Sequence, residues 1–426
     1  MRLSNLRRYL ADKEKRHPRL VGSLRRFNRR LQRLQGPTHP AILRNEIAAV
    51  SEVLKSPFWN LNYGGNLVHE TLEQEFAEYV GAHHAVAVST GGMAIQMCLR
   101  AFGLKPGDEV LHQIDTCVAD AFAVFAAGAT PIFADINREN FMLAQTSAAD
   151  EISPATKAIM PVHMWGNPEN MDWISGLAKK NALYVIEDAC LALGAELKGK
   201  RVGSFGDAAV FSFGCLKPIQ AGEGGIITTN DESLAKELRT IRNWGDMSKE
   251  YGVRDQRTLS WNGRISEIVA AVGLEQLRGY PQYLEKLRDL VNEFTRRLEK
   301  FENLEIAVPE SGELKPAYSQ VVVRLNKSGV GILKSDLMSR LNEQGIPVWH
   351  ANFEPINQLS FFREDHWQDW IIRGDLDRVR RNYHRVFANS EEVYANSGLG
   401  FSRDNFSSKE RVLRLVRALE RALRKG

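Results

Sequence analysis

Residues 183–230 read LYVIEDACLALGAELKGKRVGSFGDAAVFSFGCLKPIQAGEGGIITTN. One apolar run ends in Asp188, a second ends in Ser212, and Lys217 lies in the loop that follows. A glycine-rich turn at 222–225 leads into a third apolar run. Short apolar runs bounded by such turns are typical of strands that are buried on both faces of a sheet.

Similar runs continue on both sides of this stretch, from about residue 41 to residue 240. Seven predicted strands occupy residues 85–90, 109–114, 130–135, 157–163, 183–188, 208–213 and 225–229. Helix-like segments lie between several of them, at 93–102, 118–127 and 171–180. Strands that alternate with helices predict a layered α/β fold with a mostly parallel seven-stranded sheet, and ligands of such sheets gather at the carboxyl ends of the strands.

The second half of the chain predicts a further, smaller unit. A long helical region at 265–301 is followed by one strand-like and two helix-like runs, at 321–325, 334–344 and 411–424. We therefore predict a large domain at 41–280 and a smaller C-terminal α+β domain at 281–426 that includes the linking helix. Residues 1–40 are predicted to form a separate N-terminal extension.

The N-terminal extension is strongly basic. Residues 1–36 contain twelve Lys or Arg and only two acidic residues, a charge of +10, whereas the whole chain carries +4. Apolar residues from Leu20 to Leu34 recur at steps of three and four, which predicts an amphipathic helix. Two interpretations stay open: the helix packs its apolar stripe on its own protein, or it contacts a nucleic acid or an anionic membrane.

Length and composition exclude several classes of protein. The 426 residues are 43% hydrophobic, which supplies a large core and excludes a disordered chain or a small disulfide scaffold. The cysteines show neither CxxC nor Cys/His spacing, so we expect reduced thiols and no metal site. The sequence has no apolar run of roughly eighteen residues and no signal peptide, so we expect a cytoplasmic protein.

Asp188 and Lys217 are the residue types that a pyridoxal phosphate enzyme needs at neighbouring strand ends. The lysine amine forms a Schiff base with the cofactor, and the carboxylate keeps the pyridine nitrogen protonated so that the ring accepts electrons. Taken singly, a loop lysine is usually a solvated surface group and an aspartate at a strand end often caps a helix. A Gly-Glu-Gly-Gly run is usually a turn. The ordered set favours the chemical interpretation.

The chain resembles the DegT/DnrJ/EryC1/StrS aminotransferases over roughly residues 41–425. The most specific part of the resemblance is SFGCLKPIQAGEGGIITTND, at 212–231. Further similar blocks are AVAVSTGGMAIQMCL, KPGDEVL, AGATPIFADI, KAIMPVHMWGNPENMDWI, VIEDAC and WNGRISEIVAAVGLEQL. The resemblance implies the type I fold of pyridoxal-phosphate-dependent transferases, as in aspartate aminotransferase, with pyridoxal 5'-phosphate bound by the large domain.

The resemblance also assigns roles to single residues. Lys217 matches the lysine that holds the cofactor and then moves a proton between the substrate carbon and C4′, and Asp188 matches the partner of the pyridine nitrogen. These two are the predicted catalytic residues. Ser212 matches a hydroxyl that binds the cofactor phosphate. Asn262 matches an asparagine that reaches the phosphate of the neighbouring subunit, which implies a homodimer with shared active sites; its alternative role is a cap for the helix that starts near Ser266.

Five more residues complete the predicted cofactor site. Gly91, Gly92 and Met93 occupy a turn between a strand and a helix, where backbone N–H groups favour a phosphate, although such a turn also suits glycine for its conformational freedom. Similarity places His163 near the face of the ring, whereas a single histidine after an apolar strand is more often a hydrogen-bonded core residue. Cys117 occupies the position of an aromatic residue that stacks on the pyridine ring.

Three positions depart from the family pattern. Gly92 stands where a threonine is usual, so a side-chain contact to the phosphate is lost. Cys117 offers less contact area than an aromatic ring. Leu191 stands where a glutamine would donate a hydrogen bond to the phenolic oxygen of the cofactor. Together these departures predict an unusually tuned cofactor site.

The resemblance implies an aminotransferase that moves an amino group from an amino acid to a keto sugar or a cyclitol. Glutamate or glutamine is the amino donor that members of this family commonly use. The sugar is expected to be linked to a nucleotide. One alternative is a dehydratase of the same family that uses pyridoxamine phosphate, but those relatives commonly have histidine where this chain has Lys217. The other is a non-catalytic regulator or scaffold that retains the fold, which the three departures and the basic extension would suit.

Overall fold

The computed structural model describes residues 40–56, 67–253, 255–256, 258–308, 312–326 and 332–424. The chain divides between Ala48 and Ala49, and the fold below is that of the second unit, which extends to Gly426. Helix α3 (Pro40–Lys55) crosses this division. The basic helix predicted within residues 1–36 lies outside the described residues.

The large domain contains the predicted seven-stranded sheet. In sheet order its strands are β1 (His84–Val88), β9 (Gly225–Thr229), β8 (Ala208–Ser212), β5 (Tyr184–Asp188), β4 (Thr156–Met160), β2 (Glu109–Gln113) and β3 (Thr130–Ala134). Only β9 runs against its neighbours β1 and β8, and the other pairs are parallel. The fold class and all seven predicted strands are confirmed, because each apolar run is long enough to cross the core.

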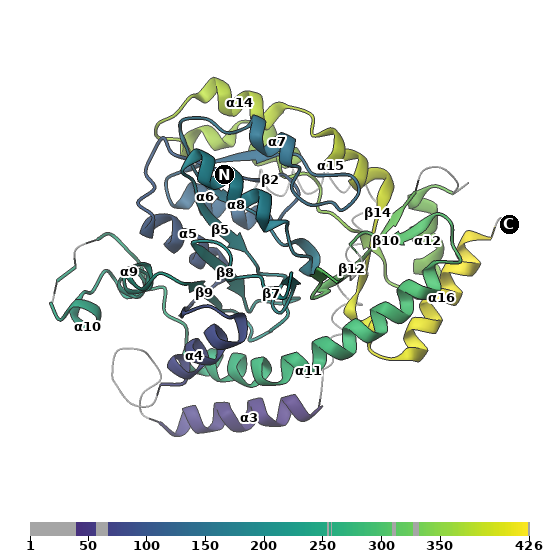
Figure 1. Cartoon of the computed structure of the whole chain (residues 1–426), viewed down its shortest axis with the longest axis horizontal. Helices are drawn as coiled ribbons and strands as arrows, with labels where there is room; N and C mark the ends of the chain where they lie inside the picture. Colours follow the sequence, from purple (N-terminus) through teal and green to yellow (C-terminus); the bar gives the residue numbers. More distant parts are fainter. Residues whose placement is uncertain are drawn as a thin grey trace, which may run out of the picture. The chain divides into compact units, whose positions relative to one another are not determined.

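Helices connect and cover these strands (Figure 1). In chain order they are α4 (Val68–Val80), α5 (Gly91–Ala101), α6 (Val118–Ala126), α7 (Gln145–Asp150), the short η1 (Met164–Gly166), α8 (Met171–Asn181), α9 (Glu232–Arg242) and α10 (Ser248–Tyr251). A small three-stranded sheet is formed by β6 (Glu196–Leu197), β7 (Lys200–Arg201) and β11 (Leu314–Lys315). Among the helices described, none is both long and apolar enough to cross a membrane.

The strand period of two explains how the sheet is covered on both faces. Val210 of β8 packs in one cluster with Leu99 of α5 and with residues of α6 and α9. The next residue, Phe211, points to the opposite face and packs with Phe76 of α4 and Leu274 of α11. The Phe76 and Phe211 ring centroids lie 4.9 Å apart at near-perpendicular planes, a favourable edge-to-face geometry.

The smaller C-terminal domain contains an antiparallel sheet in the order β10 (Leu304–Ile306), β12 (Gln320–Leu325), β14 (Gly398–Ser402) and β13 (Trp349–His350). Helices α12 (Lys334–Glu343) and α16 (Lys409–Leu423) pack on this sheet. Helices α13 (Ser360–Arg363) and α14 (Leu376–His384) instead pack against β2 and β3 of the large sheet, and α15 (Ala388–Glu392) follows them in the chain. Four further helical turns are η2 (Ile356–Gln358), η3 (His366–Trp370), the π-helical η4 (Val393–Ser397) and η5 (Arg403–Phe406).

Helix α11 (Glu267–Leu298) joins the two domains and spans 32 residues (Figure 1). Its first half packs Leu274 and Leu277 against the large sheet. Its second half packs Val291 and Phe294 into the core of the small domain, beside β12, β14 and α16. One continuous helix therefore contributes to both hydrophobic cores, which couples the two domains. The exact boundary at residues 280 and 281 stays a prediction.

Asp115 forms a second, polar connection between the domains. It follows β2 directly, is fully buried, and accepts hydrogen bonds from the hydroxyl of Ser390 and the side-chain amide of Asn352. Burial raises the pKa of Asp115 to about 7, although both hydrogen bonds act to lower it. The side-chain oxygen of Asn352 has no partner among the described residues. A flipped Asn352 amide would let a protonated Asp115 donate to that oxygen, so the connection suits a neutral carboxyl.

Because Asp115 ionises more easily in the unfolded chain, near pH 4, than in the native state, near pH 7, it makes the native state lose stability as pH rises between these values. Across about three pKa units the loss approaches about 4 kcal/mol. We predict that Asp115→Asn, which keeps an acceptor and a donor but cannot ionise, is more stable relative to wild type at pH 8 than at pH 5. Urea unfolding at both values measures this difference.

The control for this prediction is Asp172→Asn, which changes an exposed carboxylate in an ion pair with Lys198. Its stability relative to wild type should hardly change between pH 5 and pH 8, because an exposed ion pair contributes little at either value. A difference for Asp115→Asn that is also constant with pH would show that Asp115 ionises normally in the native state.

Candidate active site

Three predicted residues lie at the carboxyl edge of the large sheet. Asp188 is the last residue of β5 and Ser212 is the last residue of β8, and these two strands are parallel neighbours in which Asp188 pairs with Val210. Lys217 follows five residues after Ser212. The parallel pairing therefore brings the acid and the lysine loop to one corner of the molecule, as the sequence predicted.

Asp188 is buried, and only 5% of its surface is exposed. Its Oδ1 accepts the backbone N–H of Cys190 at 3.0 Å. The neighbouring Glu187 points to the opposite face of the sheet, since successive strand residues alternate. Asp188 is thus held by a backbone donor on the face that also carries the lysine.

The Lys217 loop is held from both domains. The backbone N–H of Lys217 donates to Gly214 O at 3.4 Å, and the preceding Leu216 has a positive φ of 67°. Arg403, in η5 of the small domain, donates through Nη2 to the carbonyl of Lys217 at 2.9 Å. The small domain therefore helps to fix the backbone from which the amine projects.

The charge of Lys217 depends on its surroundings. Burial lowers the pKa of its ammonium group, but electrostatic interaction with the neighbouring Cys190 and Asp188 side chains raises it by more, so the pKa lies above the usual value for lysine. The amine is therefore protonated at neutral pH in the cofactor-free protein. It must transfer that proton before it can act as a nucleophile.

The first turn of α5 forms a potential anion site. Thr90 caps this helix by accepting the N–H of Met93 at 3.0 Å. The N–H groups of Gly91 and Gly92 have no acceptor among the described residues, as is usual for the first turn of a helix. A helix N-terminus with free N–H groups attracts phosphate.

Ser212 lies against this turn. A Cβ atom added to Gly91 would lie only 2.9 Å from Ser212 Cβ, so no side chain fits between them. A Cβ added to Gly92 would meet no atom within 4 Å. Gly91 is therefore required by the close approach of two elements, whereas Gly92 faces open space. The structure brings Gly91, Gly92, Met93 and Ser212 together as the sequence predicted for a phosphate site.

The glycine-rich turn also has a steric role. A Cβ at Gly225, the first residue of β9, would lie 2.7 Å from the carbonyl carbon of Thr90. Gly222 and Gly224 have positive φ values of 89° and 145°, which other residues rarely adopt. The glycine-rich segment at 222–225 therefore forms a turn and also lies close against the start of α5.

His163 is completely buried, and both of its ring nitrogens have protein partners. Nε2 lies 3.1 Å from Glu187 Oε2, and Nδ1 accepts the backbone N–H of Glu169 at 2.9 Å. These bonds select the tautomer with the proton on Nε2. His163 could meet a ligand only through its ring carbons, so its polar atoms support the core, which was the alternative interpretation of this residue.

Glu187 is a structural residue that the sequence analysis did not single out. Besides His163, its carboxylate accepts N–H groups from Gly203, Phe205 and Gly206, each at 2.8 Å. Burial raises the pKa of Glu187, but these hydrogen bonds outweigh burial and the pKa lies below its usual value. The signal in the sequence that could have indicated this structural role is the set of glycine residues that follow the acid at the strand end.

Asn262 is exposed, and its position leaves the predicted intersubunit role open. The adjacent Gly263 carbonyl accepts the N–H of Ser89, so this loop runs beside the β1–α5 turn of its own chain. Helix α11 is capped by Ser266, whose hydroxyl accepts the N–H of Ile268 at 3.3 Å. Asn262 is therefore not the cap of α11. Its contact with a neighbouring subunit stays a prediction.

Cys117 and a missed acid lie at the start of α6. Cys117 is the exposed residue that precedes this helix, and its thiol interacts electrostatically with Lys217 and Asp188. Asp120, in the first helical turn, is buried and its carboxyl contacts that of Asp188. In the sequence Asp120 resembled an ordinary acid that complements a helix dipole, and only the tertiary structure shows its position.

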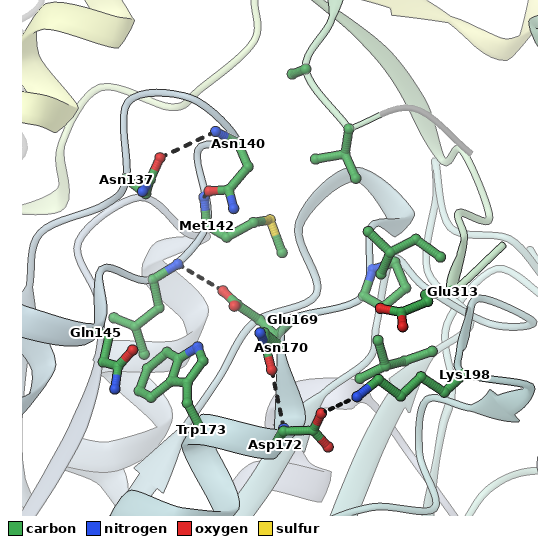
Figure 2. A pocket seen from close by; sticks show the side chains of 16 residues that line it. Asn137, Asn140, Met142, Gln145, Glu169, Asn170, Asp172, Trp173, Lys198 and Glu313 are labelled. Atoms are coloured by element: carbon green, nitrogen blue, oxygen red, sulfur yellow. Dashed lines mark hydrogen bonds and ion pairs between the residues drawn. The ribbon is translucent and has the colours of Figure 1, made fainter. Parts of the chain in front are cut away.

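A cavity of about 470 Å³ lies apart from this cluster (Figure 2). It is formed by the loop after β3, the start of α8 and residues 307, 308, 313 and 314, and its polar lining includes Asn137, Asn140, Glu169 and Asn170. Figure 2 shows Glu169 bonded to the backbone of the Asn140–Gln145 loop and the Asp172–Lys198 ion pair at one side. None of the predicted site residues lines this cavity.

Known proteins resemble this chain over most of its length. The sequence is 31% identical over 358 residues to the spore coat polysaccharide biosynthesis protein SpsC of Bacillus subtilis, covering 82% of this chain and 90% of that protein. It is 37% identical over 282 residues to GDP-perosamine synthase of Caulobacter vibrioides, covering 65% of this chain and 75% of the synthase.

Solved structures show the same fold. The aminotransferase from Psychrobacter cryohalolentis superposes with a TM-score of 0.79 at 26% identity, covering 88% of this chain and 95% of that chain. S. venezuelae DesV, in complex with a ketimine intermediate, superposes with a TM-score of 0.75 at 29% identity, covering 91% and 96%. The sequence model of the DegT/DnrJ/EryC1/StrS aminotransferase family matches residues 40–372. The chain belongs to this family and is a pyridoxal-phosphate-dependent aminotransferase.

Proposed function

We propose that this enzyme transfers an amino group from an amino acid, glutamate or glutamine, to the keto group of a nucleotide-linked sugar. The observation that carries the proposal is the convergence of Asp188, Lys217, Ser212 and the first turn of α5 at one corner of the sheet. The names of two relatives, a GDP-perosamine synthase and a spore coat polysaccharide biosynthesis protein, support a sugar as acceptor. A cyclitol remains the second acceptor class.

The residues present fit pyridoxal 5'-phosphate. Gly91 and Gly92 offer free backbone N–H groups to its phosphate, whereas the Met93 N–H is donated to Thr90, and the hydroxyl of Ser212 lies beside the same turn. Asp188 offers a carboxylate for the pyridine nitrogen, and Lys217 offers an amine for the aldehyde carbon. When bound, the cofactor acts as an electron sink that stabilises negative charge on the substrate carbon.

The protein supplies position and proton transfer. Asp188 is held by the Cys190 N–H, so its charge can stay directed at one point. Lys217 Nζ, once it is free of the cofactor, holds and moves the proton at the reacting carbon. The Arg403 contact fixes the Lys217 backbone, which limits the positions that this amine can reach. Overall an amine and a carbonyl exchange partners, so no external oxidant or reductant is needed.

The active unit in this proposal is a homodimer in which Asn262 reaches the phosphate bound by the neighbouring subunit. Its support is the exposure of Asn262 on a loop beside the phosphate turn. The presence of Lys217 disfavours the dehydratase alternative. Contact of residues 1–36 with a nucleic acid or an anionic membrane, and the cytoplasmic location, stay predictions.

Lys217→Ala should abolish covalent attachment of the cofactor. Wild-type protein mixed with pyridoxal phosphate should show the visible absorption band of the lysine-bound cofactor, and borohydride should fix that cofactor on the peptide containing Lys217, as measured by mass spectrometry. The variant should show neither signal and no transamination, because no other amine occupies this position.

The matched control is Lys198→Ala, which removes an exposed lysine on the same domain and should leave both signals unchanged. Wild-type protein without a visible band at saturating cofactor, or a borohydride adduct on a different lysine, would contradict the proposed function.

Gly91→Ala and Gly92→Ala should differ although they change adjacent residues. The Gly91 methyl group would clash with Ser212, so Gly91→Ala should lose about 1–3 kcal/mol of stability in urea unfolding. Gly92→Ala should be neutral or gain up to about 1 kcal/mol, because its methyl group meets open space and alanine favours helix. Equal losses for both variants would show that Gly91 and Ser212 do not approach closely.

Gly92→Thr should strengthen cofactor binding. Open space around Gly92 accommodates the larger side chain, and its hydroxyl would add a donor to the first turn of α5. A net hydrogen bond to a charged phosphate is worth about 1.5–3 kcal/mol, so we expect a dissociation constant lower by about tenfold or more. Titration of the visible band measures this, with Gly92→Ala as control. Unchanged affinity would place the phosphate elsewhere.

A further inference from the structure

Asp120 places a second acid beside Asp188. It lies in the first turn of α6, and only 3% of its surface is exposed. The Thr116 hydroxyl donates to Asp120 Oδ2 at 2.5 Å. The Asp120 carboxyl lies close enough to that of Asp188 for a side-chain hydrogen bond between them. Strand β4 separates β2, which precedes α6, from β5, so the two acids come from different parts of the sheet.

Two carboxyl groups in contact share one proton, because both cannot be ionised at that distance in a buried site. Burial and the charge of Asp188 raise the pKa of Asp120 well above its usual value. Asp188 has the Cys190 N–H as an additional donor. The proton of the pair therefore resides on Asp120.

The hydrogen-bond geometry is complete in this state. One oxygen of Asp120 accepts from Thr116, and the other carries the proton and donates to Asp188. Asp188 then accepts from Cys190 and Asp120 and retains a lone pair for a further donor. Asp120 thus acts on the same carboxylate that the proposed function assigns to the pyridine nitrogen.

We propose that Asp120 is a positioning residue that, as a neutral hydrogen-bond donor, holds the Asp188 carboxylate in place for the pyridine nitrogen of the cofactor. This inference rests on the proposed function. Asp188, held by the Cys190 N–H and by Asp120, would present its carboxylate to the pyridine nitrogen in one orientation. A neutral Asp120 also leaves one negative charge opposite the ammonium of Lys217 rather than two.

Other ionisable groups around the pair do not replace this donor. Cys190, which follows β5, and Cys117, which precedes α6, are the thiols that interact with Asp188, and Lys217 approaches from the loop after β8. His112 of β2 also interacts with Asp188, but burial lowers its pKa to about 4 and its Nδ1 donates to the Gln113 carbonyl, so the imidazole is neutral. Burial raises the pKa of Cys190 well above its usual value, so its thiol is neutral. Asp120 is the carboxyl group in contact with Asp188 among the described residues.

Asp120→Asn and Asp120→Ala test whether the donor matters. The asparagine amide can accept from Thr116 and donate to Asp188, as a protonated aspartate does, whereas alanine can do neither. We expect Asp120→Asn to bind pyridoxal phosphate with the wild-type dissociation constant, measured by titration of the visible band. We expect Asp120→Ala to bind about tenfold to a hundredfold more weakly, because a hydrogen bond to a charged group is lost.

A second measurement needs no cofactor. The infrared spectrum of the cofactor-free protein at neutral pH should contain the C=O stretching band of a protonated Asp120, and the wild type minus Asp120→Asn difference spectrum should isolate it. Asp115→Asn is the matched control, since Asp115 is a buried acid on the same loop that is bonded to Ser390 and Asn352 rather than to Asp188. Its substitution should leave cofactor affinity unchanged.

Three results would overturn the proposal: an Asp120→Asn difference spectrum without a protonated carboxyl band, equal affinities of wild type and Asp120→Ala, or Asp120→Asn as weak as Asp120→Ala. The last result would mean that a negative charge on Asp120 is required. A wild type that binds no cofactor would overturn the proposed function and this role together, whereas a wild type that binds normally beside unaffected variants would overturn this role alone.

Discussion

Glu187 is a fully buried carboxylate next to Asp188, and its charge is held by donors from several parts of the large domain. An isolated charge in a protein core would be very unfavourable, so the chain surrounds it with His163 and with the N–H groups of Gly203, Phe205 and Gly206. These donors come from the end of β4 and from the connection that leads to β8. The charge of Glu187 on β5 therefore joins the segment after β4 to the connection that precedes β8.

Successive strand residues point to opposite faces of the sheet, which separates the structural acid Glu187 from the active-site acid Asp188. Because Glu187 points to one face, its neighbour Asp188 must point to the other, toward Lys217 and Asp120. One acid is thus structural and the adjacent one is available to a ligand. The small domain also constrains the site, because Arg403 holds the backbone of Lys217. Helix α11 contributes to the cores of both domains and so keeps Arg403 and Lys217 in fixed relative positions.

Much of this arrangement could be predicted from the sequence. The seven strands are short apolar runs, and β5 and β8 end in polar residues, so a parallel sheet had to bring Asp188 and Ser212 to one edge. Pairings across long distances in the sequence were not predictable in the same way. His163 engages Glu187 through its ring, a contact that depends on how β4 and β5 are placed side by side.

The sequence by itself determined the fold class, the family and the order of the lysine, the acid and the glycine-rich turns, because local apolar periodicity and short motifs record these directly. Only the tertiary structure decided that Gly91 is excluded from having a side chain by Ser212 while Gly92 is not, and that Asp120 meets Asp188. Both facts depend on distances of a few ångström between segments far apart in the chain. Such distances are set by packing of the whole core, and no local pattern of residues encodes them.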